Sequence, residues 1–169
     1  GARYRWQLPD CHGIEGAQIE RDMGPYSLGV WLGDGSSNQA RLTSHRDDID
    51  AIVAGFEAEG YAENARYIHA TTGVPTVSFS VGKGRGKSKL REDLEREGVW
   101  ANKHIPAHWL TASREQRALL LAGLMDTDGY CEPRTGRCHI ITVSKKLSEG
   151  IQDLCASMGY TVSYTHLTL

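Results

Sequence analysis

Two aspartates end similar nine-residue segments that lie far apart in the chain. The segment Leu121–Gly129 reads LAGLMDTDG, and the segment Ser27–Gly35 reads SLGVWLGDG. Alignment places Asp34 opposite Asp128, and glycines coincide at two further positions. An apolar helix that ends in an acid, present twice, predicts two helices packed side by side with both carboxylates at one end. Helix C-termini disfavour negative charge and the two acids repel each other, so a divalent cation is expected there, with Mg²⁺ as the natural candidate.

Small residues recur four positions apart in both segments. They are Gly29 and Gly33 in the first segment, and Gly123 and Thr127 in the second. Residues four apart lie on one face of a helix, so these four can let two helix backbones approach closely. We therefore predict that they form the helix–helix interface.

The bulk composition indicates an ordinary globular protein. The chain has 169 residues, of which 40% are hydrophobic, and its net charge is −2. This balance does not suggest a nucleic-acid-binding protein, although such binding needs a basic stripe on one face, which net charge does not reveal. The sequence shows no signal peptide and no apolar run of the roughly 20 residues that a bilayer requires. We expect a cytoplasmic protein with no membrane partner.

Four cysteines are too few and too scattered for a secreted disulfide scaffold. They are Cys11, Cys131, Cys138 and Cys155. Cys131 and Cys138 are expected to face each other across a hairpin, but no second pair of ligands completes a zinc site. We therefore predict reduced thiols and no zinc.

Hydrophobic periodicity and turn residues predict the same order of elements twice. A helix is expected from Pro25, where proline suits the first turn, to Asp34. A hairpin at 36–44, a helix at 47–59, strands at 63–70 and 76–81 and a helix at 88–97 should follow. The second series comprises a helix from Ser113 to Met125 or Asp126, strands at 130–132 and 138–144, a helix at 145–158 and a strand at 161–167. This matching order indicates an internal repeat.

These motifs resemble a known family. Leu121–Gly129 differs only at Met125 and Thr127 from the motif that names the LAGLIDADG homing endonucleases. Pro25–Gly35 is similar to the first motif of the two-motif members that are embedded in inteins. The segments 102–106 (NKHIP) and 4–9 (YRWQLP) also resemble intein-type sequence, the latter at the exit from a splicing domain.

The resemblance implies an α+β fold of two pseudo-symmetric αββαββα repeats. The motif helices pack at the repeat interface, and the sheets form a β saddle over DNA. Residues 1–24 would be a lead-in from an intein splicing domain, 25–104 the first repeat with its linker, and 105–169 a second repeat truncated at its C-terminus. The chain is then expected to act as a pseudo-dimeric monomer embedded in a host protein, with the splicing chemistry outside these residues.

The resemblance also implies a metal-dependent hydrolysis of double-stranded DNA across the minor groove. Asp34 and Asp128 would be the catalytic metal ligands, and the carbonyls of Gly33 and Thr127 further ligands. Lys103 stands where the family places a basic residue near the scissile phosphate, where it would stabilise developing charge. The plainer interpretation of Lys103 is a solvated loop lysine.

The expected DNA-binding residues lie on strands and on one basic loop. Alternate positions of a strand share a face, and Arg, Ser, Thr and His can reach bases or phosphates. The candidates are Arg41, Thr43, Arg66, Ser78, Ser80, Lys83, Arg85, Lys87, Arg137 and His139. The plainer interpretation is that these are the wet faces of half-exposed strands and a solvated linker.

The main alternative function is a non-catalytic DNA- or RNA-binding module on the same fold, like a maturase or a regulator. The presence of both Asp34 and Asp128 favours the enzyme, because a binding module has no need of two acids at helix ends. Asp126 has no acidic counterpart in the first segment. It is expected to form a cap or a salt bridge rather than to bind metal.

Overall fold

The computed structural model describes residues 12–79 and 88–163. The chain is a mixed α+β protein with small antiparallel sheets, which confirms the predicted class. The elements in chain order are α1 (Pro25–Asp34), β1 (Arg41–Thr43), α2 (Ile49–Ala58), β2 (Glu63–Ile68), β3 (Pro75–Phe79), α3 (Lys89–Arg96), α4 (Ala107–Leu110), α5 (Arg114–Asp128), β4 (Gly129–Cys131), β5 (Cys138–Ile140) and α6 (Lys145–Ser157).

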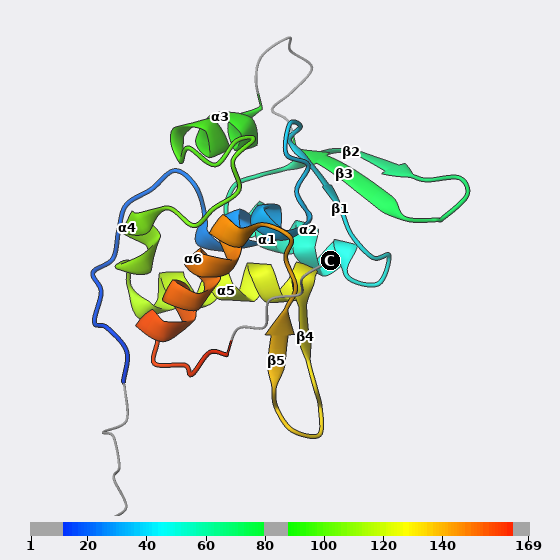
Figure 1. Cartoon of the computed structure of the whole chain (residues 1–169). Helices are drawn as coiled ribbons and strands as arrows, with labels where there is room; N and C mark the ends of the chain where they lie inside the picture. Colours follow the sequence, from blue (N-terminus) through cyan, green and yellow to red (C-terminus); the bar gives the residue numbers. More distant parts are fainter. Residues whose placement is uncertain (1–11, 80–87, 164–169) are drawn as a thin grey trace, which may run out of the picture.

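Helices α1 and α5 lie side by side at the centre of the molecule (Figure 1). Helix α1 is buried continuously from Ser27 to Leu32, so it has almost no polar face. Glu59, directly after α2, caps the N-terminus of α1. Its carboxylate accepts hydrogen bonds from the backbone N–H groups of Tyr26 (3.0 Å) and Ser27 (2.7 Å). A carboxylate at a helix N-terminus also complements the helix dipole.

Helix α5 begins at a side-chain cap. The Ser113 hydroxyl accepts a hydrogen bond from the N–H of Gln116 at 3.3 Å, as expected for a good N-cap residue. The Gln116 amide in turn exchanges hydrogen bonds with the backbone of Ile19, at 3.0 and 2.8 Å. Arg117 is fully buried and donates to the carbonyl oxygen of Ser157 at 2.6 Å, which ties α5 to the C-terminal end of α6. The segment around Ile19 therefore packs along the start of α5.

The first sheet has the strand order β1–β3–β2, and all its pairs are antiparallel. One face carries Leu42, Val77 and Phe79, which are buried against α2. Phe79 stacks on Phe56 of α2, with ring centroids 4.3 Å apart. This alternation of buried and exposed positions is the period expected of a half-buried strand, so the opposite face is left toward solvent.

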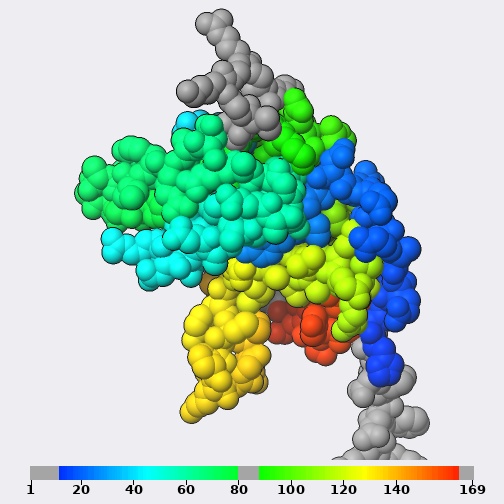
Figure 2. Space-filling model, turned by 180° about the vertical axis from the view of Figure 1, so that it is seen from behind, coloured from blue at the N-terminus to red at the C-terminus, as the bar shows by residue number. Residues whose placement is uncertain are grey.

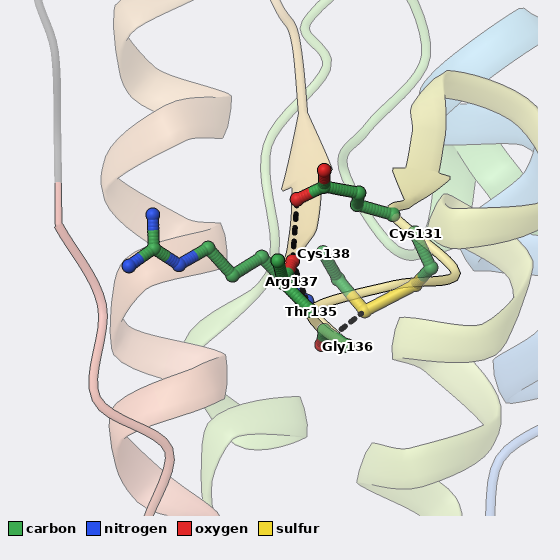
Figure 3. The surroundings of a disulfide bond; sticks show 6 residues. Cys131, Thr135, Gly136, Arg137 and Cys138 are labelled. Carbon is green, nitrogen blue, oxygen red and sulfur yellow. Dashed lines mark hydrogen bonds between the residues drawn. A yellow bond between two sulfur atoms is a disulfide. The ribbon is translucent and has the colours of Figure 1, made fainter.

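The second sheet is the two-stranded hairpin β4–β5. Its register places Tyr130 opposite His139 and Cys131 opposite Cys138. The two cysteines form a disulfide across the strands, with their Cα atoms 4.0 Å apart (Figure 3). The predicted facing of the cysteines is confirmed, but the predicted reduced thiols are wrong, because directly opposed positions bring the two Cβ atoms within bridging distance.

Several predicted boundaries differ from the structure. The first hairpin is reduced to an isolated bridge between Gly35 and Leu42, because only three residues of the second arm, Arg41–Thr43, form a strand. Strand β5 ends at Ile140 rather than at 144. Residues 161–163 form no strand, and the remainder of the strand predicted at 161–167 lies outside the described residues.

The sheet and the hairpin project to the same side of the helix pair. In the space-filling view the sheet (cyan to green) and the hairpin (yellow) leave a notch between them (Figure 2). Helix α1 leads into the bridge at Gly35, and α5 leads directly into β4 at Gly129. The ends of both central helices therefore lie where the two sheets begin. Among the described helices, none combines the length and the apolar character that crossing a bilayer needs.

Candidate active site

Two acids at the ends of α1 and α5 form the centre of the candidate site. The two helix ends are in contact: a Cβ added at Gly33 would lie 2.1 Å from Thr127 Oγ1 and 3.4 Å from Asp128 Oδ2. Burial raises the pKa of Asp34, and the neighbouring charge of Asp128 raises it further. Burial also raises the pKa of Asp128. The structure therefore brings the two predicted carboxylates together in a partly desolvated place where negative charge is disfavoured.

Lys103 is the cation of this site. Its ammonium group donates a 2.6 Å hydrogen bond to the carbonyl oxygen of Gly33 and lies 5.4 Å from the centre of the Trp31 ring. Burial lowers the pKa of Lys103, whereas the charges of Asp128 and Asp34 raise it. Reciprocally, the lysine lowers the pKa of both acids. The interpretation of Lys103 as a solvated loop lysine does not fit this half-buried position.

The loop that carries Lys103 is fixed by aromatic and backbone contacts. Trp100 stacks on Trp31 of α1, with ring centroids 6.1 Å apart, and the Arg91 guanidinium lies 4.9 Å from the Trp100 centroid. Ala101 has a positive φ of 54°, which is uncommon outside glycine, and its N–H donates to the carbonyl oxygen of Ser37 at 3.0 Å. Non-glycine residues in this conformation persist only where surrounding contacts impose it.

A cavity of about 600 Å³ opens beside these residues. Gly33, Lys103 and Asp128 line it on the side of the central helices. The segment 141–147, which connects β5 to α6, lines the other side. The site therefore has open space next to Asp128 and Lys103.

The residues present suit a hard divalent cation. Asp34 and Asp128 supply carboxylate oxygens, and the Gly33 carbonyl already accepts a hydrogen bond from a cation. The Thr127 hydroxyl is occupied, because it donates to the carbonyl oxygens of Gly123 and Leu124 at 3.1 Å each, which leaves the Thr127 carbonyl as the possible ligand. Within residues 12–79 and 88–163, no group of three His, Cys, Asp or Glu residues forms a richer metal site.

Asp126 points into a different set of contacts. Its Oδ2 atom accepts a 2.8 Å hydrogen bond from the Tyr26 hydroxyl of α1. Burial and this bond raise the pKa of Tyr26, so the phenol stays protonated and able to donate. Asp126 thus links the two central helices by a hydrogen bond from a phenol, rather than by the expected cap or salt bridge.

The predicted DNA-binding residues of the first sheet divide between its two faces. Register places Arg41 opposite Ser78 and Thr43 opposite Thr76, so these residues share the face turned toward solvent. Arg66 lies opposite the buried Val77 and therefore belongs to the other face. There its guanidinium pairs with Glu63 at 2.8 Å and with Asp50 of α2.

The remaining candidates lie on the hairpin or outside the described residues. His139 is exposed on β5, and the exposed Arg137 precedes that strand, with a side chain that extends away from the disulfide (Figure 3). The predictions at Ser80, Lys83, Arg85 and Lys87 lie outside the described residues.

Sequence reasoning missed two exposed tyrosines beside these residues. Tyr67 lies opposite Thr76 on the solvent face of the first sheet and is 63% exposed. Tyr130 lies opposite His139 on the hairpin and is 61% exposed. No two-residue period links either tyrosine to the predicted positions, because Tyr67 is next to Arg66 and Tyr130 is on the other strand from His139, so only the strand pairing reveals them.

Comparison with known proteins found one matching family and several similar proteins. Residues 104–168 match the family described as homing endonuclease. The chain is 35% identical over 136 residues to the replicative DNA helicase DnaB of Mycobacterium intracellulare, covering 80% of this chain and 19% of the helicase. It is 30% identical over 148 residues to the ATP-dependent DNA helicase Hel308 of Thermococcus kodakarensis, covering 80% of this chain and 13% of that helicase.

A third relative is itself named as an endonuclease. The chain is 24% identical over 168 residues to the homothallic switching endonuclease of Saccharomyces cerevisiae, covering 83% of this chain and 28% of the relative. The chain thus spans less than a third of the length of each of these three proteins.

Proposed function

From the premise that residues 104–168 match the homing endonuclease family, we propose that this protein is a site-specific DNA endonuclease. The observation that carries the proposal is the meeting of Asp34, Asp128 and Lys103 at the ends of α1 and α5. Two carboxylates and one ammonium group beside a cavity are suited to hydrolysis of a phosphodiester, a reaction in which negative charge builds up on oxygen atoms.

Mg²⁺ is the proposed cofactor, held by Asp34, Asp128 and the carbonyl oxygens of Gly33 and Thr127. When bound, the ion would supply Lewis-acid stabilisation of the attacking and leaving oxygens. The support is electrostatic, because both acids are partly desolvated and their pKa values are raised, so positive charge at this point is favourable.

The chain's own residues have distinct roles in this proposal. Asp34 and Asp128 hold negative charge at fixed positions at the helix ends. Lys103, on the loop that Trp100 anchors to Trp31, stabilises charge that develops on the scissile phosphate. All three groups are half-buried, which reduces the access of water and strengthens each charge interaction.

Double-stranded DNA would lie across the solvent face of the first sheet and the β4–β5 hairpin, with cleavage across the minor groove. Arg41, Thr43 and Ser78 face solvent on the sheet, and Arg137 and His139 are on the hairpin. Because both surfaces begin at the ends of the central helices, DNA bound to them would pass over the acid pair. The two surfaces flank the notch seen in Figure 2.

We further propose that the molecule is built from two related units that act together as a pseudo-dimeric monomer. In each, a buried helix ends at an acid and is followed by a glycine that pairs with a later residue: Gly35 with Leu42, and Gly129 with Ile140. Each pairing is followed by an amphipathic helix, α2 or α6. The order of elements therefore supports the LAGLIDADG-type architecture.

Embedding in a host protein as an intein is the proposed biological context, with a cytoplasmic location. The chain resembles short parts of two helicases with different names, and a similar part of an endonuclease. A segment common to such different proteins is typical of a mobile module. The non-catalytic binding module stays as the second candidate, and the partly buried acid pair is the observation against it.

Cleavage of uninterrupted host DNA tests the proposal. The protein is incubated with Mg²⁺ and overlapping duplexes that cover the gene encoding the chain, with the inserted segment removed. We expect one double-strand cut, lost in Asp128→Asn and when the metal is chelated. Specific binding without any cut by the unaltered protein would establish the non-catalytic alternative instead.

A further inference from the structure

The ammonium group of Lys103 already sits where the site needs a cation. It bonds at 2.6 Å to the carbonyl of Gly33, in the last turn of α1. The last four carbonyls of a helix have no partner within the helix and carry the negative end of its dipole. This carbonyl is also one of the oxygens proposed to bind the metal. Lysine and metal therefore share a ligand.

Lys103 is also the charge partner of both acids. Its ammonium interacts electrostatically with both Asp128 and Asp34. The three groups together carry a charge of −1, whereas the two acids alone carry −2. The lysine thus performs, in the absence of divalent ions, part of the neutralisation that a metal would perform.

We propose that Lys103 is a built-in counter-cation that a divalent ion must displace from the Gly33 carbonyl, so that this lysine sets the metal affinity of the DNA-free protein. The inference rests on the proposed metal site of the preceding section. A protonated ammonium group has no lone pair, so the lysine cannot itself become a ligand of the ion. The like charges of ammonium and metal also repel at short distance.

The structure provides a place for the displaced side chain. Lys103 lines the cavity of about 600 Å³ beside the acids, and its four-carbon stem is flexible. After displacement the ammonium can turn into this space, where the proposed substrate phosphate would lie. The same residue would then serve the two states in turn, neutralising the acids before metal binding and the phosphate afterwards.

The test measures metal affinity in the absence of DNA. Ca²⁺ and Mg²⁺ are titrated calorimetrically into the whole protein at neutral pH and low ionic strength. Lys103→Met retains the length and packing of the stem and removes the charge. We expect this variant to bind either ion about tenfold more tightly than the unaltered protein, the lower end of the effect of a like charge within ~4–6 Å. Lys103→Arg should keep the original affinity.

A second lysine of the same cavity is the matched control. Lys146 lines the cavity too, but its ammonium lies 3.5 Å from Asn102 Oδ1 rather than at the acids. Lys146→Met should leave the affinity unchanged. Equal or weaker binding by Lys103→Met, or an equal gain in Lys146→Met, would overturn the inference.

Acid variants separate this inference from the proposed function. Ion binding that persists in both Asp34→Asn and Asp128→Asn would refute the proposed metal site itself. Ion binding lost in both acid variants, but equal in Lys103→Met and the unaltered protein, would refute only the role of the lysine. Were no ion bound by the unaltered protein or by Lys103→Met, both proposals would fail.

Discussion

Gly29 of α1 and Gly123 of α5 lie face to face, and neither position has room for a side chain. A Cβ atom on Gly29 would lie 2.1 Å from the Leu120 carbonyl oxygen and 3.1 Å from the Cα atom of Gly123. A Cβ atom on Gly123 would lie 2.3 Å from the Tyr26 carbonyl oxygen. These contacts are with backbone, which cannot turn aside, so they set how closely the two helices approach.

Substitution at this contact should therefore destabilise the whole domain. We expect Gly123→Ala to lower the free energy of unfolding by about 1–3 kcal/mol, as overpacking in a core does. Urea denaturation measures the change. Ala118→Leu, an enlargement at an exposed position of the same helix, is the control and should have little effect. A free energy of unfolding equal to that of the unaltered protein would mean that the helices can move apart without loss of stability.

Removal of one acid should stabilise the metal-free protein. The pKa of Asp34 is raised in the folded state. Between the ordinary pKa of aspartate and this raised pKa, the folded protein therefore binds more protons than the unfolded one. The free energy of unfolding falls as the pH rises through this range. Asp34→Asn should raise the free energy of unfolding at pH 7 by about 1 kcal/mol, within the range of single stabilising substitutions.

The sign of this effect has two checks. Near pH ~4, close to the ordinary pKa of aspartate, the difference between the variant and the unaltered protein should shrink. Added Mg²⁺ should raise the melting temperature of the unaltered protein, because a ligand that binds only the folded state stabilises it, and should not raise that of Asp34→Asn. A variant that is less stable than the unaltered protein at pH 7 would contradict the prediction.

Two arginines of the first sheet should differ in their effects on DNA binding. Arg41 faces solvent, whereas Arg66 lies on the opposite face and is held by Glu63 and Asp50. Arg41→Ala should weaken DNA binding and reduce the slope of log affinity against log salt by about 1, the effect of one lost phosphate contact. Arg66→Ala should change neither by a comparable amount. Fluorescence anisotropy over a salt series measures both, and equal losses would contradict the division of the faces.

Reduction of the hairpin disulfide should loosen β4–β5 without unfolding the rest. A disulfide that closes a short loop lowers the entropy of the unfolded chain. In this account it stabilises the folded state by about 2 kcal/mol. With a dithiol reductant, amide hydrogen exchange in the hairpin should accelerate while exchange in α1 and α5 stays slow. Cys131→Ser should behave like the reduced protein in either condition. Unchanged exchange on reduction would show that strand pairing alone holds the hairpin.

Trp100 should act on catalysis by positioning Lys103. Loss of its stack on Trp31 frees the loop that carries the lysine. Trp100→Ala should lower the kcat of DNA cleavage about tenfold with little change in KM, since small displacements of positioned groups carry costs of this order or larger. Trp100→Phe retains an aromatic stack and should recover most of the rate. A change in KM alone would assign Trp100 to DNA binding instead.

The two acids of the site could be predicted because the residues next to them in the sequence mark the helix ends. Asp34 and Asp128 each follow an apolar run and precede a glycine, so their helix ends could be placed without a structure. Lys103 could be selected only by resemblance, because nothing in the surrounding sequence shows that its ammonium reaches the Gly33 carbonyl, 70 residues away. Contacts between distant segments depend on packing, which periodicity does not encode.

The placements that the sequence did not reveal have the same origin. Arg66 shares the two-residue period of a DNA-facing strand, but its face is decided by the pairing of β2 with β3 and by the acids beside it. The thiols of Cys131 and Cys138 became a disulfide because the hairpin register sets them directly opposite each other. Register is a property of two strands together, so one strand's sequence does not determine it.

The pairing of α1 with α5 has a consequence for the order of events during synthesis. The two acids are 94 residues apart in the sequence, and at roughly 5–20 residues per second the second acid emerges about 5–20 s after the first. Until then α1 has no partner, and half of the proposed site does not exist. A nascent chain therefore lacks the proposed acid pair until Asp128 has been translated, a delay that the arrangement of the fold imposes without any inhibitor.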